Sequence, residues 1–148
     1  MMILTRPFSP TDIPSVMEIV RRSLGESYPP SLYLTVHSLW GDGFLVIVEE
    51  GRIVGFVAAV PSGEKVARVL MLAVSPGNRR RSYGQRLMSE LYGNCISKGY
   101  DTVILEVRKS NREAIEFYER QGFAINGEIM SFYSNGEDAY KMLKVLES

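Results

Sequence analysis

Residues 71–88, MLAVSPGNRRRSYGQRLM, decide the fold of this chain because they run from a buried strand through an arginine-rich turn into a helix. The apolar run Met71–Val74 suits a buried strand, and from Leu87 onward apolar residues recur at helical spacing. Between these two elements, residues 77–84 (GNRRRSYG) bring backbone N–H groups to the start of a helix. The unpaired N–H groups and the positive end of the helix dipole make this turn a candidate phosphate site.

Other interpretations of the turn stay open. Three consecutive arginines also suit a solvated loop with no ligand. The spacing lacks the Gly-Lys-Ser/Thr of a Walker loop and the Gly-x-Gly-x-x-Gly of a dinucleotide site. Ser82 and Gln85 have the spacing of a capping box, so the Ser82 hydroxyl either reaches a phosphate or satisfies N–H groups of its own helix.

Length and composition exclude several classes of protein. A chain of 148 residues is one domain's worth and buries about 68–70% of its unfolded surface. Seventeen basic and seventeen acidic residues leave no net charge, so we expect no general attraction to nucleic acid or to a membrane. We find no apolar run of the ~20 residues that span a bilayer and no signal peptide, and we expect a soluble cytoplasmic protein. Cys95 and His37, each single, predict no metal site.

Periodicity and turn residues predict the remaining elements. Because a strand, a helix and a second strand follow one another, we expect a parallel pair of strands joined by a crossover. The predicted strands are Met2–Arg6, Phe44–Glu49, Ile53–Val60, Val66–Val74, Thr102–Arg108, Ile125–Tyr133 and Asp138–Val145. The four predicted helices are one that follows Ser9, one over Leu32–Trp40, one from Ser82 to Lys98, and one that follows a capping box at Ser110.

An acidic residue interrupts the second strand of the parallel pair. Alternation places Val103, Leu105 and Val107 on one face and Glu106 on the other. A carboxylate in so apolar a strand is unfavourable unless it is paired, hydrated or functional, so Glu106 is either a site residue or part of an ion pair with an arginine. On the following helix, Tyr118 is either a core aromatic residue or a second site residue.

Three separated motifs resemble one known superfamily. Residues 79–84 (RRRSYG) resemble the acyl-CoA pyrophosphate loop of the GNAT acetyltransferases, with Ser82 in place of its first glycine. The run 105–111 (LEVRKSN) and the segment 132–142 (FYSNGEDAYKM) are similar to RimI-like and archaeal N-terminal acetyltransferases within that superfamily. The segment 28–32 (YPPSL) departs from the Leu-Pro-Glu-Asn-Tyr of this group because it lacks the glutamate.

This resemblance implies a fold, a cofactor and a set of site residues. It implies a single N-acetyltransferase domain over residues 1–148, of α/β (α+β) class, with a mixed, mostly antiparallel sheet of about seven strands, a parallel pair at its centre and about four flanking helices. The implied cofactor is acetyl-CoA. By the resemblance, Leu72, Ala73 and Val74 contact the pantetheine arm, Arg79, Arg80, Arg81, Ser82, Tyr83 and Gly84 bind the pyrophosphate, Asn111 also contacts the cofactor, Glu106 is the proton acceptor, Tyr118 is the proton donor, and Tyr33 and Tyr133 line a peptide slot.

The expected reaction is direct transfer of acetyl to the N-terminal amine of a peptide or protein. An α-amine with a pKa near 7.7–8.0 is roughly a tenth neutral at pH 7, whereas a lysine amine is less than about a thousandth neutral. The difference is worth about 3.5 kcal/mol, so a carboxylate such as Glu106 is a better base for an α-amine. Two alternatives stay open: acetylation of lysine or small-molecule amines, and a non-catalytic acyl-CoA-binding subunit. The sequence does not decide between a homodimer, an auxiliary subunit and a monomer.

Overall fold

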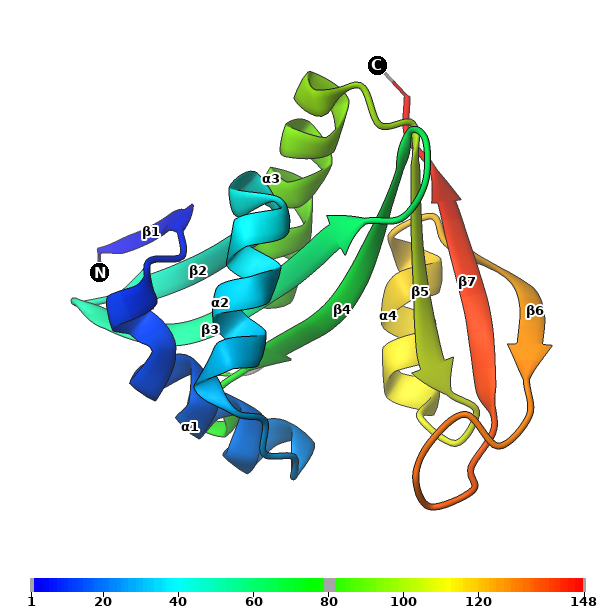
Figure 1. The fold of residues 1–148 in the computed structure, drawn as a ribbon, viewed down its shortest axis with the longest axis horizontal. Coiled ribbons are helices and arrows are strands. Elements are labelled where there is room, and N and C mark those ends of the chain that lie inside the picture. The colour runs from blue at the N-terminus through cyan, green and yellow to red at the C-terminus, as the bar shows by residue number, and fades with distance from the viewer. Residues whose placement is uncertain (1, 79–81, 148) are drawn as a thin grey trace.

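A sheet with helices on both faces organises the chain. The computed structural model describes residues 2–78 and 82–147. The seven strands lie in the order β1-β2-β3-β4-β5-β7-β6, with α1 and α2 in front of the sheet and α3 and α4 behind it (Figure 1). The strands are β1 (Ile3–Pro7), β2 (Phe44–Glu49), β3 (Arg52–Pro61), β4 (Val66–Val74), β5 (Thr102–Arg108), β6 (Ala124–Ile129) and β7 (Ala139–Val145), and the helices are α1 (Ile13–Leu24), α2 (Pro30–Leu39), α3 (Tyr83–Lys98) and α4 (Arg112–Arg120).

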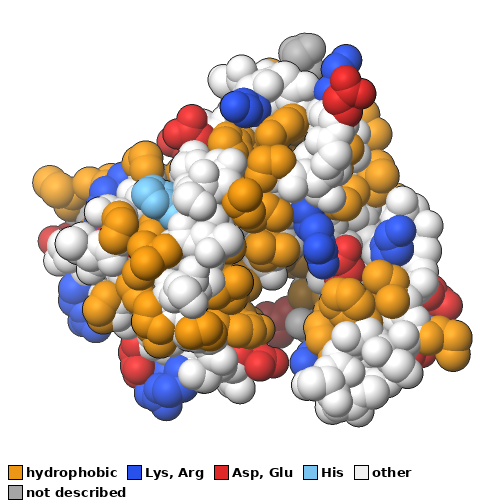
Figure 2. Space-filling view, viewed as in Figure 1, with side chains coloured by type: hydrophobic (Ala, Val, Ile, Leu, Met, Phe, Trp, Pro, Cys, Tyr) orange, Lys and Arg blue, Asp and Glu red, His pale blue; other side chains and the backbone are white. Residues whose placement is uncertain are grey.

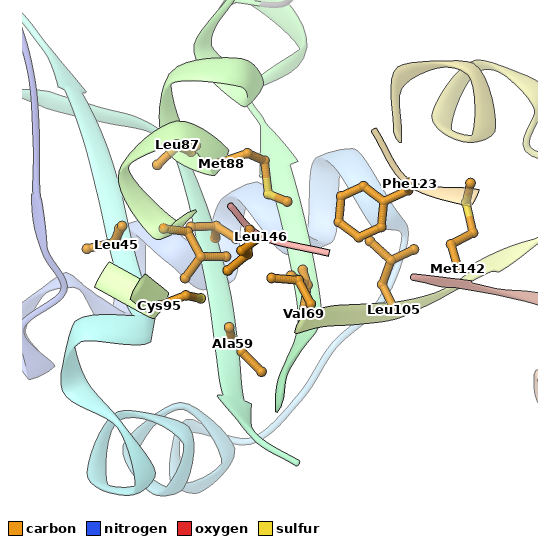
Figure 3. Packing of buried hydrophobic residues seen from close by; sticks show 14 of the residues in the cluster. Leu45, Ala59, Val69, Leu87, Met88, Cys95, Leu105, Phe123, Met142 and Leu146 are labelled. Carbon is orange, nitrogen blue, oxygen red and sulfur yellow. The ribbon is translucent and has the colours of Figure 1, made fainter. Parts of the chain in front are cut away.

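The sheet separates two apolar cores. Behind it, α3 and α4 pack on buried residues of β2 to β5 and β7, where Cys95 of α3 is fully buried; Figure 3 shows Cys95 among Leu45, Ala59 and Leu146. In front of the sheet, α1 and α2 cover β2, β3 and the end of β4. The front helices do not extend over β5 and β7, so no helix covers the front face of these two strands (Figure 1).

A β-bulge in β4 changes which side chains face each core. The register with β3 shifts at Leu70, because Ala58 lies opposite Met71 and Ala59 lies opposite Val69. Before the bulge Val69 belongs to the rear core, and after it Leu72 packs on the rear core while Ala73 joins the front core. The extra residue at the bulge thus reverses the alternation in the last four residues of the strand.

The expected parallel pair is present, but it is short. β4 and β5 are paired only from Val66 opposite Thr102 to Arg68 opposite Ile104. Beyond that point β4 continues along β3, β5 continues along β7, and the two strands diverge (Figure 1). Alternate backbone groups of β4 after Arg68 therefore face an opening in the middle of the sheet.

The predicted fold is confirmed, and two element ends differ from the prediction by two residues or more. The strand predicted to reach Tyr133 ends at Ile129, because Ser131 has a positive φ of 51° and its N–H donates to Asp138 Oδ1 at 2.8 Å. β6 and β7 still pair as antiparallel strands, joined by a loop over residues 130–138. The helix predicted to begin at Leu32 begins at Pro30, since a proline fits the first turn of a helix.

Candidate active site

A cavity of about 870 Å³ extends from the opening in the sheet to the N-terminus of α3. Its walls come from the end of α1, the end of β4, the start of α3 and one face of α4. Of the residues that the sequence assigned to a cofactor, Leu72, Ala73, Val74, Ser82, Tyr83, Gly84 and Asn111 all line this cavity, and so does Tyr118. Arg79, Arg80 and Arg81 lie outside the described residues.

The start of α3 is formed differently from the predicted capping box. Ser82 has a left-handed backbone, with φ 62° and ψ 20°, and its side chain makes no capping hydrogen bond. The box at Ser82 is therefore wrong, because a left-handed residue does not present its hydroxyl to the first turn as an extended N-cap residue does. A glycine adopts this conformation without strain, and the loop that residues 79–84 resemble has glycine at this position.

Buried contacts fix the first turn of α3. The first intrahelical hydrogen bond is donated by Arg86 N to Ser82 O at 3.0 Å, and the N–H groups before it lie at the helix terminus. The Tyr83 side chain is buried, and its hydroxyl donates to Glu49 Oε2 at 2.7 Å, an oxygen that also accepts from Asn78 Nδ2 at 2.8 Å. Tyr83 thus anchors the turn through its side chain while the helix terminus faces the cavity.

Gly84 lies beside α4 at the wall of the cavity. A Cβ added at Gly84 would lie 3.4 Å from Phe117 Cζ and 4.0 Å from Leu72 Cδ2, and both of those residues line the cavity.

At the start of α4, Asn111 is the N-cap, and its Oδ1 accepts from Ala114 N at 3.2 Å. The predicted capping box at Ser110 is wrong, because the Ser110 hydroxyl donates to Glu137 instead.

Tyr118 forms part of the cavity wall on the rear side of the sheet. Its ring meets Phe117 and Phe123 edge to face, with centroids 5.2 and 5.4 Å apart. Burial raises the pKa of the Tyr118 hydroxyl, and the neighbouring Tyr133 raises it further. The phenol is therefore protonated at neutral pH and above, as a proton donor must be.

Glu106 lies on the other side of the opening and does not line the large cavity. As predicted, its strand alternates, with Val103, Leu105 and Val107 buried and Glu106 on the opposite face. Arg68 of β4 donates from Nε at 2.9 Å and from Nη2 at 2.7 Å, both to Glu106 Oε1. The ion-pair alternative is thus realised, and a site role for Glu106 stays a prediction.

Arg108 joins two loops next to Glu106. Its Nη1 lies 3.2 Å from Glu137 Oε2 in the β6–β7 loop, and its Nη2 lies 3.9 Å from Glu26 Oε1 in the α1–α2 loop. The guanidinium stacks on Tyr133, with Cζ 3.9 Å from the ring centroid. Burial raises the pKa of the Tyr133 hydroxyl, whereas the charge of Arg108 lowers it and the charges of Glu106 and Glu137 raise it.

Tyr33 does not line the large cavity. It is fully buried in the front core, beside a second cavity of about 290 Å³ between α1 and the α1–α2 loop. Burial raises the pKa of its hydroxyl, with a further contribution from Tyr28. The assignment of Tyr33 to a peptide slot stays a prediction.

Sequence reasoning missed Arg68, Arg108, Glu26 and Glu137. A signal existed for Arg68, since it is the one charged residue in the strand Val66–Val74 and was a natural partner for Glu106. Arg108 and Glu137 stand in the motifs 105–111 and 132–142, but these motifs assigned them no site role, and Glu26 carried no comparable pattern. Among residues 2–78 and 82–147, no cluster of three or more His, Cys, Asp and Glu residues could hold a metal ion, and no helix is long and apolar enough to cross a membrane.

The fold and the cavity suit an acyl-CoA-dependent transferase, because a helix N-terminus at one end favours a pyrophosphate and the other end reaches an opening between two diverging strands. The chain belongs to the acetyltransferase (GNAT) family, whose model matches residues 13–123.

Individual relatives cover almost the whole chain. An uncharacterised N-acetyltransferase of Methanocaldococcus jannaschii is 33% identical over 96% of this chain and 91% of its own length. The NAA20 catalytic subunit of the N-terminal acetyltransferase B complex of Arabidopsis thaliana is 32% identical over 98% of this chain and 86% of its own. The crystal structure of Ard1 from Thermoplasma volcanium superposes with a TM-score of 0.96 and 36% identity over the full length of both chains.

Proposed function

We propose that this protein transfers acetyl from acetyl-CoA directly to the N-terminal α-amine of a peptide or protein. The relative from Arabidopsis thaliana, similar over nearly the full length, is the catalytic subunit of an N-terminal acetyltransferase complex. The observation that carries the proposal is the opening between β4 and β5, which has Tyr118 on its rear side and Glu106 on its front side.

The large cavity fits an acyl-CoA. Gly84 leaves room between Phe117 and Leu72, and the N-terminus of α3 at Ser82 suits a pyrophosphate. Leu72–Val74 would hold the pantetheine arm through backbone groups, and Asn111 would add a polar contact from the start of α4. When bound, acetyl-CoA supplies an acetyl group activated as a thioester.

The acceptor amine would approach from the front of the sheet. Figure 2 shows a hollow on this face between the α1–α2 side and the β6–β7 loop. Glu106 on this side would accept the amine proton through water, and the Tyr118 hydroxyl on the rear side would donate a proton to the departing sulfur. Tyr133 would line the peptide slot. No covalent intermediate on the enzyme is needed, and Cys95 is buried within the rear core.

The proposal is tested by comparing two peptides of the same sequence. One has a free N-terminus and its lysines blocked, and the other has a blocked N-terminus and one free lysine. We expect faster acetylation of the α-amine at pH 7, because its neutral fraction exceeds that of lysine by a factor of several hundred. Faster reaction of the lysine peptide would assign the protein to the lysine or small-amine acetyltransferases, and binding of acetyl-CoA without any transfer would assign it to the non-catalytic class.

Location and partners belong to the same proposal. We place the reaction in the cytoplasm, with protein N-termini as partners and with no nucleic acid or membrane. The Arabidopsis thaliana relative works in a complex, so a homodimer and an auxiliary subunit are both open for this chain. Measuring the mass in solution of the active protein decides whether it acts alone.

A further inference from the structure

The Glu106 carboxylate is held in an unsymmetrical way. Arg68 uses two nitrogens, and both donate to Oε1. Within residues 2–78 and 82–147, no hydrogen bond to Oε2 is present. The Glu106 side chain is 12% exposed and that of Arg68 is 36% exposed, so the pair is shielded but reachable from the front of the sheet. One carboxylate oxygen is therefore fixed, and the other is available to an incoming group.

A lone carboxylate would oppose this reaction as well as assist it. An α-amine arrives mostly as an ammonium ion at pH 7, and a nearby negative charge raises the pKa of an ammonium group. Binding would then favour the protonated amine, which has no lone pair for attack. A guanidinium beside the carboxylate offsets that charge, so the amine can lose its proton while the carboxylate still accepts hydrogen bonds.

The other charged groups nearby do not replace Arg68. On the same strand, the guanidinium of Arg108 is engaged by Glu137 and Glu26 from two loops. On β7, Lys141 lies opposite Glu106 in the strand register. The aliphatic stem of Lys141 lies 3.4 Å from where a Cβ of Gly127 would be, so this side chain follows β6.

The remaining groups near Glu106 are a tyrosine and Arg68 itself. From the β6–β7 loop, Tyr133 carries no charge at neutral pH, since burial raises the pKa of its hydroxyl. From β4, Arg68 is the residue whose positive charge directly contacts the Glu106 carboxylate.

We infer that Arg68 is a positioning residue that prevents Glu106 from holding the acceptor amine as an unreactive ammonium ion. This inference rests on the proposed transfer to N-terminal amines. It concerns the pairing of two side chains of this chain, and it assigns Arg68 no contact with the reacting atoms.

The test compares Arg68→Met with wild type on a peptide with a free N-terminus, from pH 6 to pH 10. The methionine keeps the apolar stem and removes the charge. In the plot of kcat against pH, we expect the acidic limb to move to higher pH by about one unit. The value of kcat at pH 7 then falls about tenfold, and it recovers above about pH 9. KM at pH 7 should fall as well, because the lone carboxylate binds the ammonium form more tightly.

Two control variants and two control measurements make the result decisive. Arg68→Lys restores a positive charge and should return the limb toward its wild-type position. Arg52→Met removes an exposed arginine at the start of β3 and should leave the profile unchanged. Calorimetry with acetyl-CoA and a thermal melt of each variant verify cofactor binding and folding.

The outcomes separate the two claims. If Arg68→Met loses the same fraction of kcat at every pH, or keeps the wild-type profile, the role of Arg68 is overturned while the proposed function stands. If the wild-type protein binds acetyl-CoA and acetylates no N-terminal amine, the proposed function fails first, and the inference that rests on it is rejected too.

Discussion

Replacing Tyr118 by phenylalanine tests the proposed proton donor most directly. The substitution keeps the ring that meets Phe117 and Phe123 edge to face, so the packing of α4 is conserved. It removes only the hydroxyl. We expect the free energy of unfolding to fall by no more than about 1 kcal/mol, because that is the net contribution of a typical neutral hydrogen bond to stability.

The effect on rate follows from the leaving group. General acid catalysis contributes roughly 10²- to 10⁴-fold. A thiol with a pKa near 8.5 leaves fairly well without a proton, so we expect the lower end of that range for Tyr118→Phe. A loss of about 100-fold in kcat corresponds to about 2.7 kcal/mol of transition-state stabilisation. Affinity for acetyl-CoA should stay within about threefold, because the wall of the cavity keeps its shape.

The assay measures initial rates of acetyl transfer to a free N-terminal peptide over a range of acetyl-CoA concentrations, together with calorimetry. The matched control is Tyr92→Phe, since Tyr92 is another tyrosine whose hydroxyl pKa is raised by burial, and its hydroxyl donates to Gln121 at 3.1 Å. We expect the control to keep its turnover. Unchanged kcat in Tyr118→Phe would remove this phenol from the mechanism, and loss of acetyl-CoA binding would make its role structural.

Three further predictions concern stability. Ser82→Gly relieves the left-handed backbone at φ 62° and should raise the free energy of unfolding by about 0.5 kcal/mol in urea, after the larger chain entropy of glycine is subtracted. Gly43→Ala would place a Cβ 2.7 Å from the carbonyl oxygen of Ala59 and should lower the free energy of unfolding by about 2–3 kcal/mol. An unchanged midpoint of urea unfolding would show that the added Cβ meets no such contact. Asp12→Asn loses the pairing with Arg6 and should lower the free energy of unfolding by about 2 kcal/mol at pH 7. Because this pairing lowers the pKa of folded Asp12, its contribution is present above about pH 4 and is lost as pH falls through the folded pKa, so wild type and Asp12→Asn should converge in acid.

Local patterns sufficed for most of the fold. The alternation around Glu106 placed it on the opposite face from three buried neighbours, and the structure confirms this. The apolar run Val66–Val74 predicted the central strand with its correct ends. Such features depend on the side chains of neighbouring residues and on the geometry of one strand or helix. They can therefore be predicted from the sequence without knowing which other elements the strand or helix packs against.

Features that depend on distant partners were not predictable. Arg68 meets Glu106 because β4 and β5 are parallel in one particular register, and a strand pattern does not state that register. The end of β6 depends on a hydrogen bond from Ser131 to Asp138, seven residues further along the chain. The left-handed conformation of Ser82 is a backbone property that its side chain disfavours, so the sequence indicated a capping box instead.

The bulge at Leu70 connects the fold to the site. In an uninterrupted strand, side chains two and four residues beyond Arg68 would share its face. Leu72 would then lie on the front face with Arg68, away from the rear core in which it packs. The extra residue lets one strand place Arg68 on the front, where it meets Glu106, and Leu72 on the rear, where it lines the large cavity. A single insertion in register therefore allows β4 to serve the acceptor side and the cofactor side of the same opening.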